Sequence, residues 1–376
     1  MMQPHAKTAH FITSERNRAL LRRLPWLILI PLGLFMPLLA QNNPAFIEKY
    51  YSQGVYPVIN AILRTIFGFI PVSIAELLLY ALILFAPLLP LIRGVRVLWG
   101  YAHWSRFVHL CITYLIIFGV ALNAFYIFWG FQYFRPKLGA LLSLQVTERP
   151  IEELDALCHT LAQTALTLRE EAAEDGAGVF MLTGGIDGAI NKIPAAYIAL
   201  GQEMPLFSVP PTAPKKVLNS EAMSWAGISG IYIPFTAEPN VNARQPHLLL
   251  ASSAAHESAH GIGIAREDEA NFVSYLACAR SDDASIRYSG VMLALIHSGN
   301  QLYAADQELY GKLIETYSEG MIRDLNHHSA YWRAYEGPVE EGMNQMNDTY
   351  LKHNQQESGV KSYGEMVDLL LAWHAR

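Results

Sequence analysis

Charged residues and cysteines are scarce in this sequence. Asp, Glu, Lys and Arg make up 16% of the 376 residues, against about 25% in an ordinary soluble domain. Three cysteines in this length exclude a disulfide-stabilised scaffold. The formal net charge of −6 shows no basic excess, so no nucleic-acid partner is indicated. Apolar residues reach 52%, which excludes a disordered or fibrous chain and argues against a simple soluble enzyme.

Three long apolar runs lie in the first third of the chain. They cover residues 24–40, 72–92 and 107–129, and their only acidic or basic residue is Glu76. A helix needs about 20 apolar residues to cross a bilayer. Residues 1–135 are therefore predicted to form a membrane anchor with about three transmembrane helices, and the lipid bilayer is an expected partner. Glu76 lies near the start of its run, where we expect it to reach water.

Two features of the anchor leave alternatives open. The first run also fits a signal peptide that would be cleaved after Ala40, but Leu38 occupies a position where cleavage needs a small residue. An uncleaved span is therefore favoured. Residues 56–70 are apolar but are interrupted by Asn60 and Arg64, which predicts an interfacial or re-entrant segment rather than a fourth span.

Basic residues near the ends of the spans predict the orientation. Eight lie on the segments expected to face the cytoplasm, namely Lys7, Arg16, Arg18, Arg22, Arg23, Arg93, Arg96 and Arg106. Four lie on the opposite flanks, namely Lys49, Arg64, Arg135 and Lys137. The expected localisation is therefore the cell membrane, with a cytoplasmic N-terminus and everything after Trp129 outside the cytoplasm.

Residues 136–376 are numerous enough for a domain with its own core. Apolar spacing predicts helices over 151–174, 248–260 and 267–280. The segment 225–236 is rich in β-branched, aromatic and glycine residues, which predicts one or two short strands. Pro234 confines such a strand to a sheet edge or places it at a strand end. The expected fold is a multipass α-helical membrane anchor followed by a mainly α (α+β) extracytoplasmic domain with a small β-sheet.

One motif carries chemistry, and it is the HExxH sequence from His256 to His260. Residues four apart project from one face of a helix, so both imidazoles can reach one zinc ion. Glu257 stands beside them and is predicted to act as the general base on a metal-bound water. Gly261 and Gly263 then end the helix, as glycines often do.

A catalytic zinc site needs a third protein ligand. The next helix opens with acidic residues, which a first helical turn favours in any case. We prefer Glu267 as the ligand, with Glu269 as the alternative, because Asn271 lies one turn after Glu267 and can hold a ligand histidine in place.

The order of these residues resembles the Glu-zincin metallopeptidases. In that group HExxH is followed by a helix with the pattern Glu-x-x-Ala-Asn/Asp, whose Glu is the third zinc ligand and whose last residue supports a ligand histidine. Here those positions are Glu267 and Asn271. The spacer of six residues after His260 is shorter than in the best-known members. The resemblance implies a zincin-like domain over residues 136–376.

The chain also resembles a bacterial family of multipass membrane proteins of unknown function, the domain-of-unknown-function 3810 family. The similar stretches are Trp129-Gly130 and residues 227–242, 256–272 and 347–372. This resemblance implies a membrane-bound zinc peptidase and no known substrate.

Further residues complete the expected site. The strand residues Gly230, Ile231, Tyr232 and Ile233 could hold an extended substrate backbone, although an ordinary sheet edge would look the same in sequence. A donor to the developing oxyanion is also needed, and the candidates are Tyr350, Tyr363 and His327.

Two functions from different classes remain. The first is a membrane-anchored zinc metallopeptidase that hydrolyses a peptide or protein substrate outside the cytoplasm. The second is a non-catalytic membrane sensor or assembly protein with a structural or degenerate metal site. The intact Glu257 favours the hydrolase, because a structural site needs no base there and more often uses four protein ligands.

Overall fold

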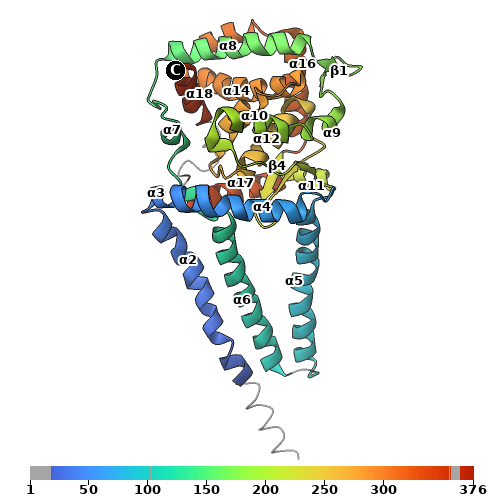
Figure 1. Ribbon diagram of the computed structural model, residues 1–376. Coiled ribbons are helices and arrows are strands. Elements are labelled where there is room, and N and C mark those ends of the chain that lie inside the picture. The colour runs from blue at the N-terminus through green and yellow to red at the C-terminus, as the bar shows by residue number, and fades with distance from the viewer. Residues whose placement is uncertain (1–17, 102, 355, 357–364) are drawn as a thin grey trace, which may run out of the picture.

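Three helices in the first third are long and apolar enough to cross a membrane. The computed structural model describes residues 18–101, 103–354, 356 and 365–376. The candidate spans within them are Arg18–Ala40, Ile74–Leu98 and Trp104–Phe128. The first comprises a short N-terminal turn, the 3₁₀ helix η1 (Leu24–Ile28) and α2 (Leu29–Ala40), and the others are α5 and α6. Figure 1 shows the three running side by side below the rest of the molecule. These helices are compatible with a membrane protein.

A second group of helices lies across the upper ends of the candidate spans (Figure 1). It consists of α3 (Pro44–Phe46), the π-helical η2 (Ile47–Val55) and α4 (Tyr56–Phe67). Helix α4 buries Tyr56 and Asn60 and exposes the apolar residues Val58, Ile62 and Ile66. Its two faces thus differ as an interfacial helix requires.

The remaining chain is mostly helical, with two small sheets. Its helices are η3 (Gly130–Phe134), α7 (Leu138–Leu141), α8 (Ile151–Glu170), α9 (Gly185–Ile190), α10 (Ile193–Glu203), η4 (Pro205–Phe207), α11 (Ser220–Trp225), α12 (His247–Gly261), α13 (Glu267–Cys278), α14 (Ala284–Ala305), α15 (Gln307–Ile314), α16 (Glu319–Arg333), α17 (Pro338–His353) and α18 (Met366–His374). Its strands are β1 (Ala173–Glu174), β2 (Phe180–Met181), β3 (Lys215–Lys216), β4 (Gly230–Ile233) and β5 (Glu238–Val241).

The larger sheet has the order β3-β5-β4. Strand β5 is in the centre, parallel to β3 and antiparallel to β4, with Gly230 opposite Val241 and Ile233 opposite Glu238. Strand β4 is therefore an edge strand of the sheet, as Pro234 directly after it suggests.

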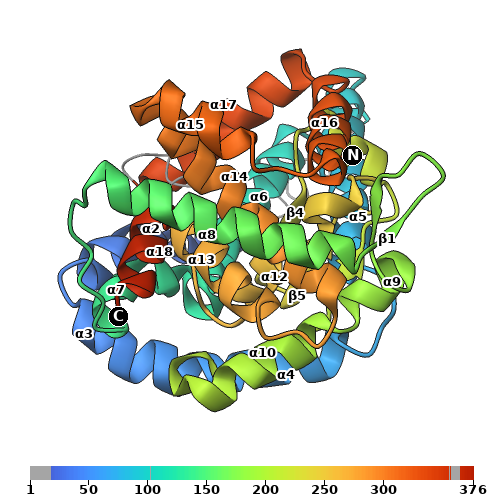
Figure 2. The same cartoon turned by 90° about the horizontal axis from the view of Figure 1, so that it is seen from above.

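Helix α12 lies in the centre of the upper part of the molecule. Figure 2 shows α8 crossing above it, with α13, α14 and α10 nearby. The core includes Leu250, Ala254 and Ala255 from α12 and Phe272 from α13, all fully buried. Small residues on α12 let neighbouring helices approach closely, so its backbone is held on several sides.

The expectation of one or two short strands over 225–236 is confirmed by one strand, β4, because α11 includes Trp225 and Gly227 adopts a positive φ of 68° that ends the helical region. Two other expectations need correction. The helix expected over 151–174 ends at Glu170, and Ala173 and Glu174 form β1 instead. Glu76 is buried, because its carboxylate accepts hydrogen bonds from the amides of Leu218 and Asn219 at the start of α11.

A buried ion pair joins the sheet to the second candidate span. Glu238 of β5 is fully buried and pairs with Lys215 of β3. The Glu238 carboxylate also accepts the amide of Ala75 at 2.7 Å, at the first turn of α5, where helix amides lack internal partners. The Lys215 ammonium donates to the Phe67 carbonyl at 2.9 Å. These contacts fix the sheet, α4 and α5 relative to one another.

Glu238→Gln should lower the free energy of unfolding by about 3–5 kcal/mol, because it leaves Lys215 charged and buried without its anion. The matched control is Asp187→Asn, which breaks the exposed ion pair of Lys216 on the same short strand and should cost less than about 1 kcal/mol. Denaturant titration of both proteins in detergent measures the difference. Equal costs would contradict the role of the buried pair.

Candidate metal centre

Helix α12 presents the two histidines of the motif on one face. His256 and His260 lie one turn apart, and their ring centroids are 4.7 Å apart. Both side chains are almost entirely buried. Small neighbours such as Ala255 and Ala259 keep this stretch of helix close to its surroundings without crowding the imidazoles.

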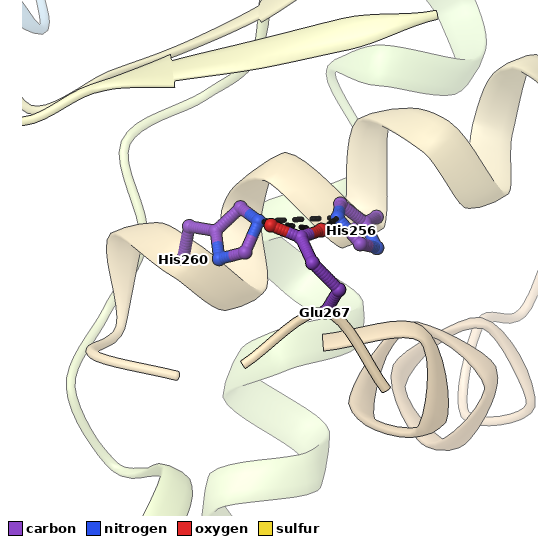
Figure 3. A group of neighbouring side chains, drawn as sticks. All are labelled: His256, His260 and Glu267. Atoms are coloured by element: carbon purple, nitrogen blue, oxygen red, sulfur yellow. Dashed lines mark hydrogen bonds and ion pairs between the residues drawn. The ribbon is translucent and has the colours of Figure 1, made fainter. Parts of the chain in front are cut away.

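Glu267 completes a group of three side chains, His256, His260 and Glu267, whose donor atoms could hold one metal ion (Figure 3). We call these three side chains the metal group. Its Oε2 lies 3.0 Å from Nε2 of His256 and 3.6 Å from Nε2 of His260, and the two Nε2 atoms are 3.1 Å apart. Ligands at about 2.0–2.1 Å on a tetrahedral zinc ion lie about 3.3 Å from one another. The three donor atoms therefore already have the spacing that such an ion requires.

The other ring nitrogens are held by partners that orient both histidines. Nδ1 of His260 donates to the Ile264 carbonyl at 2.7 Å, and Nδ1 of His256 lies 2.7 Å from Oδ1 of Asn271. Each Nε2 is thereby turned toward the group, which is the arrangement that supports a metal-binding imidazole. Asn271 thus takes the supporting position expected from the sequence.

The electrostatics of the group favour a cation at its centre. Burial alone would lower the pKa of His260, but the charges of Glu267 and Glu257 and the hydrogen bonds to Glu267 and the Ile264 carbonyl together raise that pKa to about 9. Burial likewise raises the pKa of Glu267, yet the two histidines hold it far below its usual range. Without a metal ion, a proton on His260 therefore balances the charge of the Glu267 carboxylate at neutral pH. A metal ion would replace that proton, so binding should release it.

The short spacer between the two ligand helices is a tight turn fixed by distant residues. Gly263 has a φ of +98°, and a side chain there would meet the amide of Gln132 at 2.8 Å. Arg135 donates to the Gly263 carbonyl at 2.8 Å. Six residues are therefore enough to bring Glu267 back to the histidines.

Glu269 points elsewhere. Its carboxylate accepts the amide of Leu138 at 2.7 Å and lies 3.4 Å from Arg266. It has no place in the three-residue group. The structure thus brings Glu267 to the histidines and gives Glu269 a separate contact.

Glu257 lies between the metal group and strand β4. A side chain on Gly230 would meet the Glu257 carboxylate at 2.6 Å, so only glycine leaves room for it. The Tyr232 amide also donates to Glu257. Burial raises the pKa of Glu257, and the histidines only partly offset this. A carboxylate with a raised pKa is a stronger base than usual.

The three candidate oxyanion donors differ in where they lie relative to the metal group. Tyr350 on α17 receives a hydrogen bond of 3.1 Å from the Tyr133 hydroxyl. Desolvation raises the pKa of Tyr350, and so does the charge of Glu267 nearby. It is therefore close to the metal group and stays protonated at neutral pH.

The structure does not place His327 at the metal group. The charge of His327 acts on His247, at the start of α12, and on Asp175, so it lies near these two residues. His247 is nine residues before His256, or about 13 Å along the helix, so His327 lies near the wrong end of α12. Tyr363 falls outside the described residues.

The sequence analysis did not assign two residues near the site to it. His297 on α14 is half-buried, and desolvation, aided by the charge of His256, lowers its pKa to about 4. Trp129, just after α6, donates its indole N–H to the His260 carbonyl at 2.9 Å. Both come from segments remote in the chain, and only the tertiary structure brings them to α12.

The chain was compared with protein families, curated proteins and solved structures. A family model described as a protein of unknown function, DUF3810, matches residues 51–371. That range includes α4, two of the three candidate spans and the whole metal group. No curated protein and no solved structure matches the chain.

Glu267→Gln should reduce bound zinc to less than a tenth of the wild-type content, because it removes one of three ligands. The matched control is Glu269→Gln, two residues further on the same helix, which keeps an acceptor for Leu138 and should retain zinc. Elemental analysis of the purified proteins measures both. Loss of zinc from the control alone would reverse the two assignments.

Proposed function

The chain belongs to the DUF3810 family of proteins of unknown function, and we propose that it is a membrane-bound zinc metallopeptidase. The observation that carries this proposal is the convergence of His256, His260 and Glu267 beside the buried base Glu257. The spacing of their donor atoms fits zinc, and the donor set of two imidazoles and one carboxylate is that of catalytic zinc sites. The arrangement also agrees with the HExxH pattern of the Glu-zincins.

The proposed reaction assigns a role to each group. A zinc ion held by His256, His260 and Glu267 would polarise the substrate carbonyl and lower the pKa of a water molecule toward about 7. Glu257 accepts the proton of the attacking water and passes it to the leaving amine.

Strand β4 suits the substrate side of the site. Its only strand partner among the described residues is β5, so its other edge can pair with an extended peptide. Ser229 and Asn242 form a hydrogen-bonded pair of the antiparallel ladder, so the pair Tyr232 and Pro239 is a non-hydrogen-bonded one. The Tyr232 amide therefore points away from β5, and it donates to Glu257. The open edge therefore faces the base. Tyr350 is the remaining candidate for stabilising the oxyanion.

The alternative is a non-catalytic sensor or assembly protein with a structural metal site. Two observations weigh against it. The group found among the described residues has three side chains, whereas structural zinc sites use four ligands. Glu257 is also buried beside the group at a desolvation cost that a structural site has no use for.

We propose that the metal centre lies outside the cytoplasm. The argument is the excess of basic residues near the N-terminus, in the last turns of α5 and in the first turn of α6. Of these residues, Lys7 and Arg16 lie outside the described part of the chain. The candidate spans supply the required three crossings.

Glu257→Gln should retain zinc at wild-type content and reduce peptide hydrolysis at least a hundredfold, because it removes the base but no ligand. Zinc content by elemental analysis and hydrolysis of a randomised peptide mixture measure the two effects. Activity that persists in this variant would show that Glu257 is not the catalytic base and would contradict the proposed mechanism.

Reporter fusions at Leu144 and Gly94 should lie in opposite compartments, with Leu144 outside the cytoplasm, because one span separates them. Alkaline phosphatase, active only outside, and green fluorescent protein, fluorescent only inside, read out the two positions. A cytoplasmic signal at Leu144 would overturn the proposed orientation.

A further inference from the structure

The exposed apolar face of the helices above the spans is continuous with the spans themselves. Large apolar side chains on α3, η2, α4 and the turn after it are at least half exposed. They are Phe46, Tyr50, Val55, Val58, Ile62, Ile66 and Phe69. Val58, Ile62 and Ile66 recur every four residues, so they form one stripe along α4. In Figure 1 this group crosses the ends of all three candidate spans. A bilayer that surrounds the spans would also cover this stripe.

The opposite face of α4 contacts the metal-binding helix directly. The Tyr56 hydroxyl and the Asn60 amide both donate to the Gly261 carbonyl, at 2.7 and 2.8 Å. Gly261 immediately follows the ligand His260. One helix diameter, about 10 Å, therefore separates the lipid-facing stripe from the end of α12.

The candidate span α6 also ends next to the metal group. The Trp129 indole, at the end of α6, lies 5.8 Å from the His260 ring and 5.6 Å from the Tyr232 ring, measured between centroids. The metal group thus lies at the level where the candidate spans leave the membrane.

Strand β4 leads from the metal group toward the bilayer. Gly230 and Tyr232 contact Glu257, whereas Phe235, just past the strand, packs on Phe128, the last residue of α6. The ring centroids of Phe235 and Phe128 are 6.4 Å apart. At about 3.3 Å per residue, the three steps from Gly230 to Ile233 cover about 10 Å, and Phe235 lies in the turn that follows the strand. A peptide paired with β4 would therefore run from the metal to the membrane surface.

From this geometry we infer that the substrate is the juxtamembrane segment of a membrane-anchored chain. The inference rests on the proposed peptidase function and specifies its substrate class. The anchor holds one end of the segment in the bilayer, and the segment extends along β4 to the metal. Cleavage then falls about three to eight residues from the end of the anchor, because that number of extended residues covers the distance. The anchor also raises the local concentration of the segment at the site.

The test uses the full-length zinc protein in nanodiscs of phosphatidylcholine and phosphatidylglycerol. One probe is a library of randomised twelve-residue segments joined to a single Leu/Ala span in the same discs. The matched probe is the same library without the span. The anchored library should be cut at least tenfold faster than the free one, and mass spectrometry should place the cuts three to eight residues from the span. Glu257→Gln protein in the same discs reports any contaminating protease.

The outcomes separate this inference from the function on which it rests. Equal rates for both libraries, or cuts at positions unrelated to the span, would overturn the inference and leave the peptidase standing. If neither library is cut by the zinc-loaded protein, the peptidase itself fails, and the substrate class fails with it.

A second measurement locates the metal without any substrate. Protein loaded with Co²⁺ in the same discs should enhance the phosphorus relaxation of the lipid headgroups, because a paramagnetic ion at the level of the span ends lies close to them. The control is the variant His256→Ala/His260→Ala exposed to the same Co²⁺. Enhancement no greater than in this control, with cobalt retention by the unmodified protein verified by elemental analysis, would place the metal far from the bilayer and overturn the inference.

Discussion

The last carbonyls of α12 are bound by side chains from the membrane-proximal helices, and the geometry of the metal group depends on these bonds. A helix end leaves up to four carbonyls without internal partners. Here Trp129 binds the His260 carbonyl, Tyr56 and Asn60 bind that of Gly261, and Arg135 binds that of Gly263. The same bonds that satisfy the helix end therefore hold the second histidine and the turn that leads to Glu267.

Buried charges make this attachment rigid. Arg135 is fixed by two hydrogen bonds to Glu48 of η2, at 2.6 and 3.0 Å. Lys215 and Glu238 connect the sheet to the start of α5 in the same way. Removing one member of such a pair leaves a charge without water or partner, so neither contact loosens easily. The upper part of the molecule is therefore held against the span ends by directional contacts as well as by apolar packing.

The metal group itself is a balance of burial and charge. An anionic carboxylate next to two imidazoles in a buried site calls for a positive charge, and a proton or a metal ion can supply it. The polar partners at both Nδ1 atoms leave the two Nε2 atoms to face a bound ion. Strand β4 and Glu257 border this group on one side. The Glu257 carboxylate, the outer edge of β4 and the three donor atoms therefore lie close together, next to the helices that cross the ends of the candidate spans.

The sequence alone determined the features that depend on local spacing. Uninterrupted apolar runs predicted the three candidate spans, and the i, i+4 spacing of HExxH predicted that His256 and His260 share a face of one helix. The proximity of Asn271 to Glu267 predicted which acidic residue meets the histidines, because that choice depends on a helical face. Strand β4 was also expected, although one strand formed where two were possible.

Only the tertiary structure decided what meets these elements from a distance. The partners of α12, namely Tyr56, Asn60, Trp129, Arg135 and His297, lie more than 30 residues away in the chain, and no local pattern links them to it. The same holds for Glu76, which local hydropathy places at a membrane edge in contact with water but which accepts hydrogen bonds from the two amides just before α11 and is buried there. His327 has the right chemistry for an oxyanion donor, yet the packing of α16 puts it near the other end of α12. Hydrogen bonds and ion pairs between remote segments depend on how helices pack in three dimensions, and periodicity along the chain carries no information about that packing.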